Sequence, residues 1–545
     1  MKSTISQRGC KLAMTAIASG ILVACGGGGG SSAGGVLPPV VVAPASKDAI
    51  ATAINILVLD ENAESITSGV TIQVKSEDGS TNGDAARVAP YGTDNAATSY
   101  TVNGPSTGLG LISTGSDVVA DPLDVIFVAL SDSYVSSSEK VSINEAGEYI
   151  VTITMVSKTP AQKVPVASVP PTEVAPTDAN AKTTAPIVTK TTARTADPAN
   201  NVAEVKGAGG ISIDTGTKIL VDDGAGGTKP ASAGPLTINV AYFENDTEAG
   251  DTGFTPANGA LTVFPGGLDV EVDAATPGTP ASGSFSSAGF IAVDLRDQDG
   301  NVVTNFVDDS DQPKDVTIDI TIPEGTPNPD PTLDTVVING LVDVGEQVPV
   351  WSYNELTGKW ESEKDELGND LRATVTDDDA TDGVYNVSFT TTHLSYFNLD
   401  YYGSRCTDSL SNRRIDADVV DSTGQPNNID FDFSAYQVGG GWSRYKRSYI
   451  DNTAELAVAR APSFAVRVQF LNAVNSSETL IASYTKNGTT TPVNANGELE
   501  LTNLCELDGA TITLNKPNPA NLVSLNFETV SRTKPKPLCC RLLRI

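Results

Sequence analysis

Apolar and polar residues alternate along most of the chain, and a repeat of two is the pattern of β-strands with one buried face. The alternation begins with Ile54, Ile56 and Val58, and it recurs at 70–74 and 149–155. It returns at 236–240, 268–272 and 316–322, and again at 466–470, 499–501 and 512–514. These groups predict an all-β protein made of successive β units.

The first predicted domain covers 48–158. Its last segment, SDSYVSSSEKVSINEAGEYIVTITMV, places Tyr149, Val151, Ile153 and Met155 on one face of a strand. The segment resembles the final hairpin of the small sandwiches grouped as immunoglobulin-like or carboxypeptidase-regulatory-like domains. The resemblance implies a β-sandwich here.

Residues 159–200 show no apolar periodicity and are rich in Pro, Thr and Ala. Such a composition predicts a semi-extended linker between two domains. A sugar-bearing stalk is an alternative that composition alone leaves open.

A second β-rich domain is predicted at 201–402. Within it the segments FPGGLDVEV, GFIAVDLRDQDGNVV, VPVWSYNELTGKW and THLSYFNLD follow in order. This series resembles the β-rich extracellular module of the cartilage intermediate layer protein group and similar domains of bacterial lipoproteins. The resemblance covers roughly 260–402.

The third predicted domain, 404–530, again resembles a small regulatory-type sandwich. The remaining residues, 531–545, form a short basic tail without periodicity. The prediction is therefore a series of tandem immunoglobulin-like β-sandwiches.

The N-terminus has a positive start and an apolar run too short to span a bilayer, which predicts a secretory signal at 1–24. The run ends in Leu22-Val23-Ala24-Cys25, which resembles the lipobox of bacterial lipoproteins. The resemblance implies that Cys25 is lipidated and that 25–47 is a Gly- and Pro-rich tether. Gly26 after the cysteine favours the outer membrane under the sorting rules of two-membrane bacteria. An ordinary signal that leaves Cys25 as a free thiol is the alternative.

Charge changes the expected partners. The formal net charge is −32, and removal of the three cations of the signal lowers it to −35. Nucleic acid is not expected, because phosphate binding needs lysine and arginine. The single histidine, His393, excludes zinc hydrolases that use two or three histidines. The expected partners are the membrane, through the lipid, and a glycan or protein ligand; no cofactor is expected, although calcium is permitted.

Four cysteines remain beyond the signal and the lipid site. Cys406 opens the third domain and Cys505 lies late in it, so a disulfide between them is expected in an exported protein. Cys539 and Cys540 could pair with each other, with a partner chain or with nothing, and their spacing does not decide.

Trp351, Tyr353 and Trp360 are predicted to face one another across a hairpin. They could stack on a sugar, but we favour packing in a hairpin core, because large aromatic side chains supply much of the burial in a thin sandwich.

Two acidic clusters could offer oxygen ligands to calcium. One contains Asp294, Asp297 and Asp299, and the other contains Asp377, Asp378, Asp379 and Asp382. Neither has the spacing of an EF-hand loop, and we favour solvated hairpin turns. Two DTG triplets, at Asp214 and Asp251, are only 37 residues apart, which does not suit the two lobes of an aspartic protease. We expect turns at both.

His393, Leu394 and Ser395 resemble the cleavage site of the GPCR autoproteolysis-inducing domains. The resemblance implies His393 as the base, Ser395 as the nucleophile and Leu394–Ser395 as the broken bond. Alternation instead places His393 at the edge of a core, so we expect an intact chain that is not an enzyme. The predicted function is an envelope-anchored structural or adhesive binding module; a cell-surface hydrolase or a self-cleaving protein is the alternative.

Overall fold

A computed structural model describes residues 49–518, with gaps in the described chain. The gaps are 62–63, 77–79, 91–98, 105–106, 113–122, 144–147, 224–226, 246–259, 264–267, 272–281, 355–358, 366, 378–382, 404–405, 407–413, 447–453, 460 and 473–477. Strands dominate, and no helix among the described residues is long and apolar enough to cross a membrane. The all-β prediction is confirmed.

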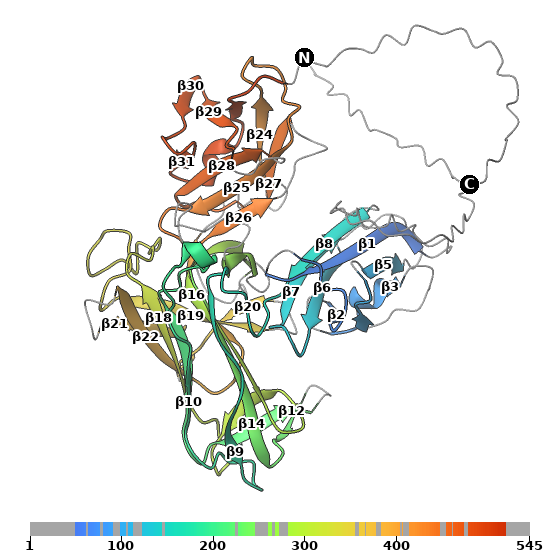
Figure 1. The fold of residues 1–545 in the computed structure, drawn as a ribbon, viewed down its shortest axis with the longest axis vertical. Coiled ribbons are helices and arrows are strands. Elements are labelled where there is room, and N and C mark those ends of the chain that lie inside the picture. The colour runs from blue at the N-terminus through green and yellow to red at the C-terminus, as the bar shows by residue number, and fades with distance from the viewer. Residues whose placement is uncertain are drawn as a thin grey trace, which may run out of the picture. The chain divides into compact units, whose positions relative to one another are not determined.

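The first β unit is a sandwich with two four-stranded sheets, ordered β3-β5-β1-β8 and β4-β2-β6-β7 (Figure 1). Its strands are β1 (Ala49–Leu59), β2 (Thr71–Ser76), β3 (Val88–Pro90), β4 (Ser99–Thr101), β5 (Thr107–Ile112), β6 (Leu123–Leu130), β7 (Ser137–Ile143) and β8 (Glu148–Thr154), with the short helix η1 (Ala85–Arg87) before β3. The alternating residues Ile54, Ile56 and Val58 are buried between the sheets, as the sequence predicts.

The middle unit is built on a twelve-stranded sheet. Its strands are β9 (Val166–Thr177), β10 (Ile187–Lys190), β11 (Ala208–Ile213), β14 (Gly234–Phe243), β15 (Asp269–Glu271), β16 (Ser282–Arg296), β18 (Val316–Pro323), β19 (Gln347–Asn354), β20 (Lys359–Ser362), β21 (Arg372–Thr376), β22 (Val384–Thr391) and β23 (Tyr396–Gly403). A small second sheet contains β12 (Lys218–Asp222), β13 (Thr228–Pro230) and β17 (Val303–Val307), and the helices are η2 (Pro198–Asn200) and η4 (Ala260–Val263).

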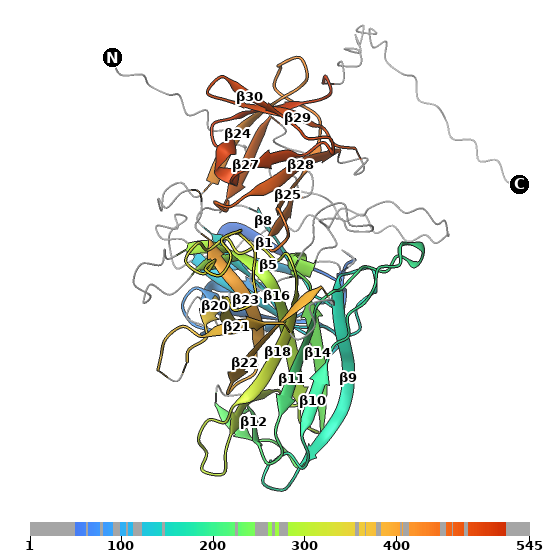
Figure 2. The same ribbon diagram turned by 90° about the vertical axis from the view of Figure 1, so that its left-hand side faces the viewer.

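The large sheet bends over its own core. Its order is β10-β11-β18-β22-β21-β19-β23-β16-β14-β9, with β15 paired to β16 and β20 paired to β19. Strand β11 contacts β14 and β10 contacts β9, although neither pair is hydrogen-bonded, so the two ends of the sheet face each other (Figure 2). Ile211, Ile238 and Ile318 are buried between these ends.

The prediction of a linker at 159–200 is wrong. Strand β9 pairs with β14 over its whole length, from Val166 opposite Phe243 to Thr177 opposite Gly234. Its prolines lack N–H groups, which an edge strand tolerates, and its central residues are exposed, so no apolar periodicity appears. The Arg194 guanidinium donates to the carbonyl groups of Val164, Val166 and Ala203, and the middle unit thus begins well before residue 201.

The third unit is a sandwich of sheets β27-β24-β32-β29-β30 and β26-β25-β28-β31. Its elements are β24 (Arg414–Val420), β25 (Phe431–Gln437), β26 (Ser443–Lys446), β27 (Glu455–Ala459), β28 (Val466–Asn472), β29 (Ile481–Lys486), β30 (Thr489–Pro492), β31 (Leu499–Leu501), β32 (Thr511–Leu514) and the short helix η5 (Leu504–Leu507). A disulfide joins Cys406 to Cys505, with Cα atoms 5.1 Å apart, which is the pairing considered from the sequence.

The first and third sandwiches share one topology. In each, the first strand pairs in parallel with the last and antiparallel with a middle strand, which gives β5-β1-β8 and β27-β24-β32. The facing sheets, β4-β2-β6-β7 and β26-β25-β28-β31, also use their strands in the same chain order. The first sandwich has an additional edge strand, β3, beside β5, and the third has an inserted hairpin, β29–β30, which extends one sheet beyond β32.

Candidate functional site

A cleft of about 940 Å³ opens between the first sandwich and the middle unit. One wall is the loop 131–136, which joins β6 to β7, and the other is formed by residues of β14, β16, β17, β19 and β23. Concave sites of this size at the junction of two domains are common ligand sites. The cleft is therefore the leading candidate for a ligand-binding site.

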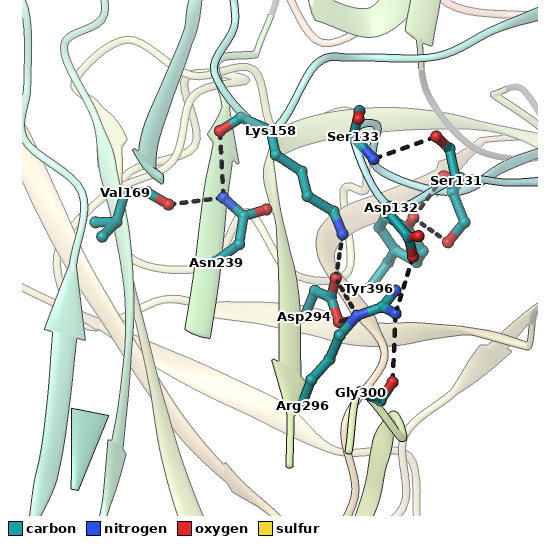
Figure 3. Close-up of polar contacts among 11 residues, drawn as sticks. Ser131, Asp132, Ser133, Lys158, Val169, Asn239, Asp294, Arg296, Gly300 and Tyr396 are labelled. Carbon is teal, nitrogen blue, oxygen red and sulfur yellow. Dashed lines mark hydrogen bonds and ion pairs between the residues drawn. The ribbon is translucent and has the colours of Figure 1, made fainter. Parts of the chain in front are cut away.

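An ion-pair network joins the two walls (Figure 3). Lys158, which follows β8, donates from Nζ to Asp294 Oδ2 at 2.5 Å, and its side chain is only 7% exposed. Arg296 donates from Nε to both Asp294 oxygens, at 3.0 and 3.1 Å. Its Nη1 reaches Asp132 Oδ1 of the opposite wall at 3.4 Å and the Gly300 carbonyl oxygen at 3.5 Å. Asp294 thus has two cationic partners, and without them the burial of its carboxylate would be costly.

Neutral hydrogen bonds hold the same junction. Asn239 of β14 donates from Nδ2 to the carbonyl oxygens of Val169, at 2.6 Å, and Lys158, at 3.3 Å (Figure 3). The buried carboxylate of Glu61, in the first sandwich, accepts the N–H groups of Ser157 at 3.0 Å and Ala161 at 3.2 Å. These bonds fix the chain segment that leaves the first sandwich and enters the middle unit.

Two hydroxyl–hydroxyl contacts join the first sandwich to the middle unit next to the cleft. Tyr396 of β23 bonds to Ser136 of the first sandwich, and Tyr353 of β19 bonds to Ser138. Because Tyr353, Tyr396 and Ser138 are buried, each contact excludes water from the junction. The walls of the cleft are therefore set before any ligand arrives.

The charges of the cleft nearly cancel. Lys158 and Arg296 are matched by Asp132 and Asp294, and Glu361 adds one more carboxylate. Most of the remaining polar lining consists of hydroxyls and of side-chain amides such as that of Asn305. Burial, followed by the charges of Asp60 and Glu61, raises the pKa of Tyr134, which keeps its hydroxyl protonated at neutral pH. A lining with little net charge and many donors and acceptors suits an uncharged polar ligand.

His393, Leu394 and Ser395 all line this cleft, but their contacts do not form a base–nucleophile pair. The Ser395 hydroxyl donates to the carbonyl oxygen of Tyr353. His393 Nδ1 lies 3.2 Å from Thr391 Oγ1, and Nε2 lies 3.5 Å from Glu363 Oε1. The imidazole is thus engaged elsewhere, and the Ser395 proton has no base to accept it in this arrangement.

The backbone around this motif is ordinary. His393 forms a β-bridge with Asn305, and the Leu394 N–H donates to the Thr304 carbonyl oxygen at 2.8 Å. Neither Leu394 nor Ser395 has a positive φ. His393 lies 5.6 Å from the Phe397 ring and is about one-third exposed, which matches the expected position at a core edge.

The possible sugar platform lies in a core. Trp351, Tyr353 and Trp360 are each at most 6% exposed, and they pack against Phe285 and Tyr396. The indole N–H of Trp351 donates to the Asp400 carbonyl oxygen at 3.0 Å. Buried rings cannot stack on a sugar, so the packing interpretation accounts for all three.

The first acidic cluster organises a hairpin turn. Asp297 accepts the N–H groups of Ser232, Asp299 and Asn301, and the Asn301 amide as well. Asp299 bonds to the Ser232 hydroxyl, and Asp294 is paired as described. Among the residues that the structure describes, no group of three or more His, Cys, Asp or Glu side chains could hold a metal ion.

The turn at Asp297 recurs along the chain. In each copy an Asp or Asn side chain accepts the N–H groups two and four residues later, and the residue three later has a positive φ. The copies begin at Asp178, Asp297, Asp308, Asp365, Asp421 and Asn494. Four contain glycine at the positive-φ position, so the spacing D/N-x-x-G is a sequence signal that would have identified these turns.

Several other candidate residues do not form sites or cannot be placed. Asp214 precedes the turn between β11 and β12, as expected. Asp377 follows β21 directly. Cys25, Asp251, Asp378, Asp379, Asp382, Cys539 and Cys540 lie outside the described residues. The residues that build the cleft junction, such as Glu61, Lys158 and Asn239, carry no local sequence signal, because their partners are distant in the chain.

Comparison with known proteins gives only low similarity to solved structures. No protein-family model matches the chain, and no curated protein matches it. The chain is similar to the major pilin subunit of Bacillus cereus, at 10% identity and a TM-score of 0.14, over 85% of this chain and 99% of that one. The full-length major pilin of Streptococcus pneumoniae is 9% identical, with a TM-score of 0.14, over 86% of this chain and 67% of that one. The major pilin of Corynebacterium diphtheriae is 8% identical, with a TM-score of 0.13, over 86% of this chain and 99% of that one.

Proposed function

We propose that the chain is a structural and adhesive binding module of the bacterial cell envelope, and that a glycan binds in the cleft between the first sandwich and the middle unit. The observation that carries the proposal is a cleft whose two walls are joined by the Lys158–Asp294 ion pair, the Asn239–Lys158 bond and two hydroxyl contacts. A preorganised site loses little conformational freedom on binding, which favours affinity.

The chemistry of the lining favours a sugar over an aliphatic or strongly charged ligand. Amides, hydroxyls and paired charges can both donate to and accept from the hydroxyl groups of a glycan. The Asn305 side chain has no hydrogen-bond partner within the described part of the chain and lines the cleft, so it is available to a ligand.

The test is a glycan and surface-protein binding screen of the purified mature chain, repeated with Asn305→Ala. We expect a glycan whose affinity falls at least tenfold in this variant. Asn428→Ala, an exposed asparagine in the third sandwich, is the matched control and should bind normally. A glycan that binds both variants equally places its site elsewhere, and loss of a protein ligand in Asn305→Ala would favour a peptide in the cleft.

We also propose that Cys25 carries the lipid and anchors the chain at the outer membrane. The support is the lipobox at 22–25 behind a charged and apolar signal. Detergent partitioning with metabolic lipid labelling tests it. A Cys25→Ala chain that still takes up label and partitions fully into membranes contradicts the anchor.

A further inference from the structure

The loop between β18 and β19 exposes an unusual group of aliphatic side chains. Nine large apolar residues are exposed in the described part of the chain, and five of them lie within 336–344. They are Val336, Val337, Ile338, Leu341 and Val344, and Ile338 is 87% exposed. Scattered apolar residues need no explanation, but a cluster on one loop indicates a contact surface. We call residues 333–346 the apolar loop.

The apolar loop is held in shape by two buried carboxylates. Glu346, 1% exposed, accepts the N–H groups of Thr335 at 2.8 Å, and of Val336 and Asp343 at 3.2 Å each. Asp334 accepts the N–H groups of Gly340 at 2.8 Å and Asn339 at 3.3 Å. The backbone is therefore fixed, and the exposure of the aliphatic side chains is a property of the folded loop.

Packing anchors the base of the apolar loop. Leu333 and Val342 are buried in the core of the middle unit, and the Val342 N–H donates to the Thr326 carbonyl oxygen at 2.8 Å. Pro327 forms a β-bridge with Leu341. Pro327 also lies against Gly439, because a β-carbon added to Gly439 would be 3.1 Å from Pro327 Cγ. The base of the loop thus borders the third sandwich, at the turn between β25 and β26.

Charge limits the partners that this surface fits. Residues 315–358 contain eight Asp and Glu and no Lys, Arg or His. This acidity repels anionic lipid headgroups, and the tip lacks the Trp, Tyr and Lys that anchor loops at a bilayer surface. A second copy of the same loop would carry the same charge. The fitting partner combines aliphatic side chains with positive charge.

The basic tail, residues 531–545, has that chemistry. The sequence SRTKPKPLCCRLLRI contains five Lys and Arg, no Asp or Glu, and the aliphatic residues Leu538, Leu542, Leu543 and Ile545. It begins 13 residues after Asn518, whose N–H donates to Asp421 of the third sandwich at 2.9 Å. Thirteen extended residues span up to about 40 Å.

We propose that the apolar loop is the docking surface for residues 531–545 of the same chain. The aliphatic side chains of the two segments leave water together, and the cations of the tail face the carboxylates around the loop. This contact is independent of the cleft and of its ligand.

Hydrogen exchange of the full chain tests the proposal. We compare it with a chain that ends at residue 530, both carrying Cys539→Ser and Cys540→Ser where those residues are present. Amides of 337–338 should exchange at least tenfold more slowly in the full chain, and 1 M NaCl or Arg541→Glu with Arg544→Glu should remove most of that difference. Ile338→Asp should abolish it, whereas Leu367→Asp, an equally exposed apolar residue elsewhere, should leave it intact.

Three results overturn the proposal. The first is equal exchange of 337–338 in the full and shortened chains. The second is protection that disappears on dilution, which assigns the tail to a second copy. The third is protection of the shortened chain by phosphatidylethanolamine vesicles with no effect of the tail, which assigns the loop to a bilayer.

Discussion

At the scale of single residues, carboxylates in this acidic chain often act as hydrogen-bond acceptors for the backbone. Asp297, Asp334 and Glu346 each accept two or more backbone N–H groups. Charge-assisted bonds of this kind are stronger than neutral ones, and an N–H left without an acceptor is costly. The acidity that first indicated an exported surface therefore also stabilises turns.

Asp297 allows a direct test of that role. Burial raises its pKa, but the hydrogen bonds from Asn301, Ser232 and Asp299 outweigh burial and hold the pKa below its usual range. The Asp297→Ala chain should lose about 1–3 kcal/mol of unfolding free energy at pH 7 in urea titration. Asp297→Asn, which keeps one acceptor oxygen, should lose less.

The pH dependence of the Asp297 effect follows from its lowered pKa. The carboxylate stabilises the fold above the unfolded pKa, near 4, and the stabilisation is lost as the pH falls through the folded pKa. The difference between wild type and Asp297→Ala should therefore shrink in acid. An Asp297→Ala chain as stable as wild type at pH 7 contradicts the assigned role.

The pKa of Glu244 is shifted in the opposite direction, because hydrogen bonds do not offset the burial of its carboxyl group. The Gly207 N–H donates to Oε2 at 3.1 Å, and Oε1 has no hydrogen-bond partner in the part of the chain that the structure describes. Burial raises its pKa from 4.5 to about 7. The folded state then binds more protons than the unfolded state between these values, so stability falls as the pH rises from 4.5 to 7.

Glu244→Gln should remove this fall. Wild type should lose about 3 kcal/mol of unfolding free energy across that window through this group, and the variant should be more stable than wild type at pH 8. Urea titrations at pH 5 and pH 8 measure it. Parallel pH profiles for the two chains would show that Glu244 is not the responsible group.

At the scale of elements, alternation predicted strands where one face is buried and the other is wet. Strand β28, with Val466, Val468 and Phe470 buried, satisfies this condition. Strand β9 does not, because its prolines and exposed central residues leave no alternation of apolar and polar residues. Only its pairing with β14 identifies it as a strand. The sequence does not predict the cleft for a related reason, because residues that meet there, such as Lys158 and Asp294, are 136 residues apart.

The Cys406–Cys505 disulfide closes a long loop within the third sandwich. Cys406 lies ahead of β24 and Cys505 lies in η5, so the bond ties the start of the third sandwich to a segment 99 residues later. Replacing both with alanine should lower the unfolding free energy of the third sandwich by about 2–4 kcal/mol, because the unfolded chain gains conformational freedom. Cys539→Ser with Cys540→Ser should not. Free thiols at both Cys406 and Cys505 in an unreduced peptide map would contradict the bond.

At the scale of the whole molecule, two sandwiches of one topology precede and follow a larger β unit along the chain, and buried polar contacts join the first sandwich to that unit. The His393–Ser395 motif, which resembles a self-cleaving site, lies at the same junction. Its side chains line the cleft, but their hydrogen bonds go to other partners.

We expect the chain to remain intact at the Leu394–Ser395 bond. Purified protein should give a single band on denaturing electrophoresis, and Ser395→Ala should not change its mobility. Two fragments, of which the C-terminal one begins at Ser395 and which Ser395→Ala abolishes, would establish self-cleavage.

We propose that the cleft between the first sandwich and the middle unit binds the ligand. Hydrogen exchange of the mature chain, with and without the glycan found in the screen, measures this binding at the cleft itself. We expect slower exchange on both walls, at 131–136 and at 303–305, when the glycan is bound. Protection confined to other segments, with both walls unchanged, would contradict it.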